Sequence, residues 1–259
     1  MYNVSVNLYK NKGGDFLGNN IKKYQGNYTQ GRVWEIDFFR GIALLLMIYF
    51  HLIFDLKDIY GYNIDYTKGF NAFTGRAAGT IFILVSGISC IFSRSNVKRG
   101  IKILALAMLI SLVTYFYNAD MIVKFGVLHF LGVSILLYSL LERMKIKENI
   151  NLLVIIATII FVLGNTVKKI TPDHDYFFIL GITSDKFVSA DYYPLVPWLG
   201  IFIYGVVIGK ALYKDKKSAF KFSIRSNLIS WIGRYTLPIY IIHQPLIILI
   251  IGLILRIKV

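Results

Sequence analysis

Three ionisable residues share the first long apolar segment of the chain: Arg40, His51 and Asp55. Arg40 and His51 are eleven positions apart, which on an α-helix is about three turns and about 16 Å of rise, so both would face one side. Asp55 follows about one turn later. Such a histidine can act as a general base with a neighbouring carboxylate, and an arginine can bind phosphate. Alternatively, Arg40 anchors the helix end at the interface and His51 makes hydrogen bonds inside a helix bundle.

Other polar residues fall at a similar depth in separate apolar segments. Thr236, Tyr240 and His243 repeat at the i, i+4, i+7 spacing of one helix face. Ionisable side chains in spanning helices are costly and usually functional, so this set predicts a lined cavity; hydrogen bonding within the bundle is the alternative for each member. No two histidines show metal-site spacing, so we expect no metal. The remaining members are Arg76, Lys124, His129, Asp191 and Gln244.

The composition is that of a membrane protein. Of the 259 residues, 56% are hydrophobic and 17% are charged, and the mean hydropathy is +0.59. Soluble domains carry about 25% charged residues, and a helix crosses a bilayer with about 20 apolar residues. We therefore predict an all-α, polytopic transmembrane bundle with about seven spans, the last of which could tilt or begin as an interfacial segment around Trp231. The predicted spans are Phe39–Leu56, Ala72–Ser93, Ile101–Tyr117, Met121–Leu141, Ile150–Val167, Tyr193–Tyr213 and one within Asn227–Leu255.

Two motifs of the GxxxG type predict close packing between helices. They are Gly75–Gly79 and Gly205–Gly209, and glycine lets two helix backbones approach closely because it has no Cβ atom. No internal repeat is visible in the chain, which disfavours a transporter built from inverted repeats. An eighth span is left open.

The distribution of charge predicts the orientation of the bundle. The chain has a net charge of +15, with Lys and Arg concentrated before the first span and in alternate loops. The positive-inside rule then places the N-terminus in the cytoplasm, although Arg256 and Lys258 would lie on the outer side. We expect the basic residues to contact membrane lipids, and no nucleic acid. Residues 1–31 lack the apolar core of a signal peptide and are predicted to be a flexible cytoplasmic tail, followed by a transmembrane domain over 32–259.

Five segments taken together resemble the heparan-alpha-glucosaminide N-acetyltransferase catalytic-domain family in its short bacterial form. Arg40 and His51, with ten residues between them, also resemble the Arg-x10-His signature of the membrane acyltransferase-three family, in which the histidine is regarded as catalytic. The long eukaryotic members of the first family carry their active histidine in a differently arranged segment. The matching segments are residues 32–43 (RVWEIDFFRGIA), 51–56 (HLIFDL), 125–132 (FGVLHFLG), 193–200 (YPLVPWLG) and 233–245 (GRYTLPIYIIHQP).

The resemblance implies an integral membrane acetyltransferase in a bacterial cell membrane. It implies that acetyl-CoA is the cytoplasmic donor and that a sugar hydroxyl or amine of an extracytoplasmic glycan or glycolipid is the acceptor. His51 would act as general base or carry a transient acetyl group, with Asp55 or Asp191 orienting the ring and Arg76 or His129 stabilising the oxyanion. The predicted sites are catalytic His51, Asp55, His129 and His243, acyl-CoA-binding Arg40 and Arg234, and acceptor-binding Arg76, Asp191 and Tyr240.

Two other functions remain compatible with the sequence. A transporter or flippase of polar solutes would use the same cavity without any dependence on CoA, and an assembly partner would catalyse no reaction. The Arg-x10-His match favours the acyltransferase, since a transporter has no reason to carry it. The acceptor, the choice between O- and N-acylation and the oligomeric state stay open.

Overall fold

The computed structural model describes residues 33–144, 149–222 and 228–255. The predicted tail 1–31 and the two basic residues Arg256 and Lys258 lie outside these ranges, so the structure does not test what the sequence predicts of them. Residues from Trp34 onward form one compact unit. The helices are α2 (Trp34–Asp58), α3 (Gly69–Ser89), α4 (Asn96–Tyr117), α5 (Val127–Arg143), α6 (Ile150–Val167), α7 (Leu195–Leu212), α8 (Leu228–Arg234) and α9 (Thr236–Leu255).

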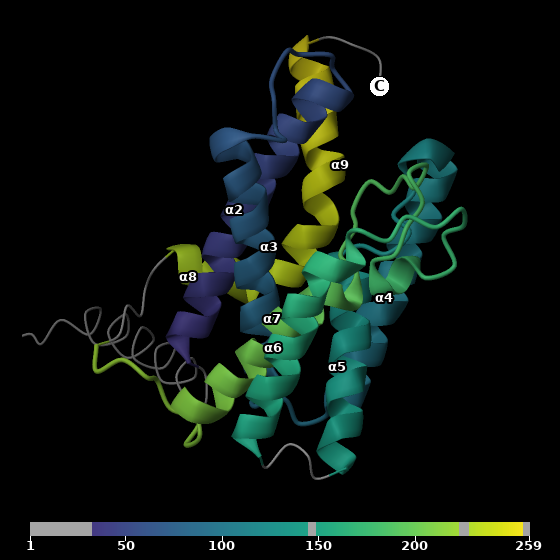
Figure 1. Ribbon diagram of the computed structural model, residues 1–259. Helices are drawn as coiled ribbons and strands as arrows, with labels where there is room; N and C mark the ends of the chain where they lie inside the picture. Colours follow the sequence, from purple (N-terminus) through teal and green to yellow (C-terminus); the bar gives the residue numbers. More distant parts are fainter. Residues whose placement is uncertain (1–32, 145–148, 223–227, 256–259) are drawn as a thin grey trace, which may run out of the picture. The chain divides into compact units, whose positions relative to one another are not determined.

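The predicted all-α membrane bundle is confirmed. Among the described residues, six helices are long and apolar enough to cross a membrane: α2, α3, α4, α6, α7 and α9. Helix α5 overlaps the fourth predicted span but begins at Val127 instead of Met121. It has 17 residues, a little less than the usual length, and it packs along α4 (Figure 1). No strand occurs in the described ranges, where pairing is limited to one isolated bridge between Phe125 and Tyr192.

The segment predicted as a long seventh span consists of two helices. Helix α8 has seven residues and contains Trp231, and α9 starts two residues after it ends. Pro238 lies in the first turn of α9, where a proline is tolerated, whereas inside a continuous helix it would clash with the preceding turn. The break therefore fits the alternative in which a separate segment around Trp231 precedes the span.

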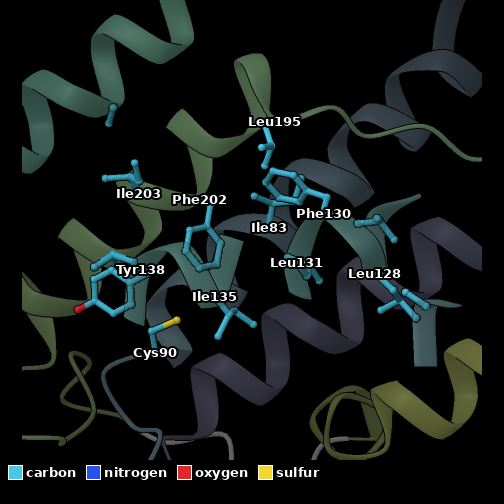
Figure 2. Packing of buried hydrophobic residues seen from close by; sticks show 14 of the residues in the cluster. Ile83, Cys90, Leu128, Phe130, Leu131, Ile135, Tyr138, Leu195, Phe202 and Ile203 are labelled. Carbon is cyan, nitrogen blue, oxygen red and sulfur yellow. The ribbon is translucent and has the colours of Figure 1, made fainter. Parts of the chain in front are cut away.

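The helices pack in sequence-adjacent and long-range pairs. Helix α6 packs on α7, α4 on α5, α2 on α3 and α8, and α3 on α7, whereas α9 packs mainly on α2 (Figure 1). The hydrophobic core lies mainly among α3, α5, α6 and α7, where the aromatic and branched side chains shown in Figure 2 interlock. Its fully buried members include Ile83, Phe130, Ile135, Leu153, Phe202 and Val206.

The two GxxxG motifs have different roles. A Cβ atom on Gly205 would overlap the backbone of Leu84, and one on Gly209 would crowd α3, so the second motif packs α7 against α3 as predicted. Gly75 instead faces the ring of Phe50, with 2.6 Å from an ideal Cβ to the ring, and Gly79 faces the hydroxyl of Tyr193. The first motif therefore makes room for two aromatic side chains, both of which line the cavity described below.

Candidate active site

A cavity of about 490 Å³ opens between α2, α3, the segment before α7, and α9. It lies at the end of the bundle that holds the C-terminal part of α2 and the N-terminal part of α3, called here the His51 end. Its polar lining includes His51, Arg76 and Asp191. Eight aromatic side chains also line the cavity: Phe50, Phe54, Tyr66, Phe82, Tyr192, Tyr193, Trp198 and Tyr240.

His51 presents one ring nitrogen to this cavity. Its Nδ1 atom is enclosed and has no hydrogen-bond partner among the described residues. Its Nε2 atom makes no hydrogen bond within that part of the chain either, and it is not enclosed. The cavity-facing nitrogen is therefore Nε2, the atom placed to exchange a proton with a bound molecule.

The ring next to His51 belongs to His243 of α9. The two ring centroids are 5.0 Å apart at an interplanar angle of 58°. His243 Nδ1 lies 2.5 Å from the carbonyl oxygen of Tyr240, and because a carbonyl can only accept, Nδ1 must carry the proton. In the neutral ring Nε2 is then an acceptor, and this atom is buried without a partner in the described structure. Two adjacent imidazoles thus each hold one unsatisfied buried nitrogen.

Asp55 lies behind His51, against α9. Its side chain is fully buried, and Oδ1 accepts a hydrogen bond of 2.6 Å from Gln244 Nε2. One turn further on, the Tyr60 hydroxyl donates to the Ile248 carbonyl at 2.7 Å. These bonds fasten the C-terminal part of α2 and the turn after it to α9. The sequence suggested that Asp55 or Asp191 orients the imidazole of His51, but neither carboxylate has a hydrogen bond to it in the described residues.

Asp191 lines the cavity and also organises the start of α5. Its Oδ2 accepts a hydrogen bond of 2.8 Å from the backbone N–H of Val127. Burial raises the pKa of Asp191 to about 6, opposed by the N–H groups of Val127 and Tyr192, which lower it. The first N–H groups of a helix lack partners within the helix, and Asp191 provides an acceptor for one of them at the start of α5. This bond holds the chain before α7 against α5.

His129 is placed in a packing position. Its Nε2 atom lies 3.1 Å from Ser111 Oγ in α4, and its Nδ1 atom accepts from the N–H of Gly126 at 3.3 Å. The ring is buried and is not part of the cavity wall. His129 therefore caps α5 and joins it to α4, so the geometry gives it no route to a substrate. This is the one predicted catalytic histidine that the fold keeps apart from the others.

Arg40 and Arg234 meet at the opposite end of α2, called here the Arg40 end. Arg40 Nη1 lies 3.4 Å from Asp37 Oδ1, and Arg234 Nε lies 3.6 Å from Asp37 Oδ2. Arg40 Nη2 also donates to Ser89 Oγ at 2.6 Å. Both arginines thus lie beside the Asp37 carboxylate. Sequence reasoning missed Asp37 as their partner, although its i, i+3 spacing from Arg40 indicated it.

Two glycines bring the arginines together. Gly41 follows Arg40 in α2, and Gly233 precedes Arg234 in α8. A Cβ atom at either position would overlap the backbone of the other helix. Each arginine therefore lies next to the point where α2 and α8 approach closely. Because Arg40 and His51 are eleven residues apart on α2, the arginine pair lies about 16 Å from His51 along the helix axis.

The fold and site define a polytopic helical membrane protein with a histidine-containing cavity at one end and an arginine cluster at the other. A family model described as heparan-alpha-glucosaminide N-acetyltransferase, catalytic, matches residues 32–245. The chain therefore belongs to this family, which confirms the predicted resemblance, and the family implies acetyltransferase activity in broad terms. No curated protein and no solved structure matches the chain.

Proposed function

We propose that this protein transfers an acetyl group from cytoplasmic acetyl-CoA to a hydroxyl or amine of a sugar on the far side of a bacterial cell membrane. The observation that carries the proposal is the cavity-facing Nε2 atom of His51. It lies on the same helix as Arg40, which is grouped with Arg234 at the other end. One helix thus links a basic cluster suited to the phosphates of CoA with a base suited to the acceptor.

The reaction needs a base that takes up the proton of the acceptor hydroxyl or amine. His51 Nε2 takes the proton from the acceptor hydroxyl or amine while its oxygen or nitrogen attacks the thioester carbonyl carbon. The tetrahedral intermediate collapses, the C–S bond breaks, and the CoA sulfur leaves as a thiolate that takes the proton from the imidazolium. In the alternative route, Nε2 attacks the thioester carbonyl carbon, the C–S bond breaks, and CoA leaves as a thiolate. The acceptor oxygen or nitrogen then attacks the acetyl-histidine, the N–C bond breaks, and the acceptor proton passes to the thiolate. Both routes require the Nε2 lone pair to face the cavity.

His243 would keep that lone pair in place. Its Nδ1–H is committed to the Tyr240 carbonyl, so its Nε2 atom can accept a hydrogen bond. A hydrogen bond from His51 Nδ1–H to His243 Nε2 would satisfy both unpaired nitrogens and leave His51 Nε2 without a proton. In this arrangement His243 takes the place that a carboxylate occupies in many catalytic triads, where the partner fixes tautomer and orientation.

Vesicles provide the test of the proposal. Right-side-out vesicles from cells that make the protein are loaded with radiolabelled acetyl-CoA and incubated with glucosamine outside. We expect acetylated sugar in the outer medium. In inside-out vesicles loaded with glucosamine, we expect acetylated sugar in the lumen, and only when acetyl-CoA is added to the medium. A transporter would instead move the sugar equally well with and without acetyl-CoA. Sugar movement independent of acetyl-CoA, with no acetylated product, would rule the proposal out.

Arg40→Ala is expected to weaken acetyl-CoA binding by about 10- to 100-fold, since a hydrogen bond to a charged group contributes about 1.5–3 kcal/mol. Calorimetric titration of the purified variant with acetyl-CoA measures this dissociation constant. Lys98→Ala is the matched control, because Lys98 is an exposed cation near the same end of the bundle, in the first turn of α4. A folded Arg40→Ala protein with an unchanged dissociation constant would separate Arg40 from donor binding.

A further inference from the structure

Arg76 is a charged side chain inside a membrane-spanning helix. It lies seven residues after the start of α3, about 10 Å along the helix axis, and it forms part of the cavity wall. No hydrogen bond or ion pair joins it to any described residue. Arg99, by contrast, donates to Ser86 Oγ at 2.9 Å. The side chain of Arg76 is exposed in the described structure, so a partner for this charge is to be sought outside the described chain.

The acidic groups near the cavity accept hydrogen bonds from neighbouring neutral groups. Asp191 accepts from the N–H of Val127, and Asp58 accepts from the Tyr66 hydroxyl at 2.7 Å. Asp65 accepts from both the N–H and the hydroxyl of Thr67. Lys57 Nζ stands 5.1 Å from the ring centroid of Tyr66, which lines the cavity. None of these carboxylates forms an ion pair with Arg76, so its guanidinium is the cationic group that the cavity offers to an anion.

The rest of the wall suits a sugar ring. Tyr193 and Trp198 pack with ring centroids 4.9 Å apart, and Phe82 stacks on Tyr240 at 6.3 Å. Such rings present flat apolar faces against which the C–H face of a sugar can lie. The hydroxyls of Tyr193 and Tyr240 make no hydrogen bond to other described residues and are not enclosed, so they are available to sugar hydroxyls.

We infer that the cavity selects an acceptor sugar that carries a negatively charged carboxylate or phosphate group. The sugar ring lies against the aromatic wall, its anionic group pairs with Arg76, and its reactive hydroxyl or amine reaches His51 Nε2. This inference rests on the proposed acetyl transfer for the identity of the reaction. The anion site itself stands on Arg76 and the cavity wall alone.

The test compares three probes with the purified protein and acetyl-CoA: glucosamine, glucosamine 6-phosphate and glucuronate. We expect kcat/KM for at least one anionic probe to exceed that for glucosamine by about 10- to 100-fold, as a charge-assisted hydrogen bond allows. In Arg76→Gln this ratio falls to near one, and in Arg76→Lys part of it remains. Lys124→Gln is the matched control, because Lys124 lies over the Phe187 ring outside the cavity wall and its loss leaves the ratio intact.

The outcomes separate the two proposals. A ratio near one in the wild type, or a ratio unchanged in Arg76→Gln, overturns the anion site even if acetyl transfer occurs. If no probe is acetylated, the same proteins are heated with glucosamine 6-phosphate, glucuronate or inorganic phosphate. Stabilisation of the wild type but not of Arg76→Gln then supports the anion site although the proposed reaction has failed, and equal stabilisation, or none, overturns it. The phosphate and carboxylate arms distinguish the two anion classes.

Discussion

Replacing His51 by alanine is expected to lower acetyl transfer by about 10²- to 10⁴-fold, the usual effect of losing a general base. The physical reason is that Nε2 of this ring is the basic nitrogen that faces the cavity. The variant should still fold, because removing a neutral imidazole takes away a buried nitrogen that has no partner in the described structure. Single-turnover transfer from radiolabelled acetyl-CoA, expressed per folded molecule, measures the loss.

His129→Ala is the comparison for this experiment. His129 is buried and bonded to Ser111 and to the N–H of Gly126, so its loss should cost about 1–3 kcal/mol of stability. Transfer per folded molecule should change little. The opposite pattern, a folded His51→Ala protein with near-normal transfer and a folded His129→Ala protein with none, would move the base from α2 to α5. That result would leave the family assignment in place.

Replacing His243 by alanine is expected to lower transfer by about 10- to 100-fold, as the loss of one buried hydrogen-bond acceptor worth about 1–3 kcal/mol implies. Without the acceptor, His51 is free to carry its proton on Nε2, which removes the lone pair from the cavity. His243→Gln should recover part of the activity, since the amide oxygen can accept from His51 Nδ1–H. The pH dependence of kcat should also shift in His243→Ala, which loss of packing alone would not cause.

The double variant gives the sharpest comparison for this pair. If His243 acts only through His51, the variant lacking both rings transfers acetyl no more slowly than His51→Ala, because residues that act as a unit are not additive. Independent roles would instead multiply the two losses. Additive losses, or an unaffected His243→Ala protein, would remove His243 from the mechanism and leave it a packing residue of α9.

The spanning helices, and the placement of Arg40 and His51 on one side of α2, could be predicted from the sequence. A bilayer requires about 20 apolar residues per helix with every backbone group bonded internally, so hydropathy alone sets element type and approximate length. Within one helix the fixed rise and turn also place Arg40 and His51 on one side without any tertiary information. The break between α8 and α9 could not be predicted from proline alone, because Pro238 lies in the first turn of α9 and Pro245 lies inside the same helix.

The partners of each polar residue were decided by the tertiary structure. Asp55 bonds to Gln244, 189 residues later in the chain, and no local pattern encodes which helices meet at that distance. The same holds for the two histidines, since α2 and α9 were expected to reach a similar depth but not to share a ring contact. His129 and Arg76 were candidates of the same kind, yet one is enclosed beside Ser111 while the other borders the cavity. Hydropathy fixes depth along the bundle axis, whereas side-chain packing between helices determines which groups at that depth face one another.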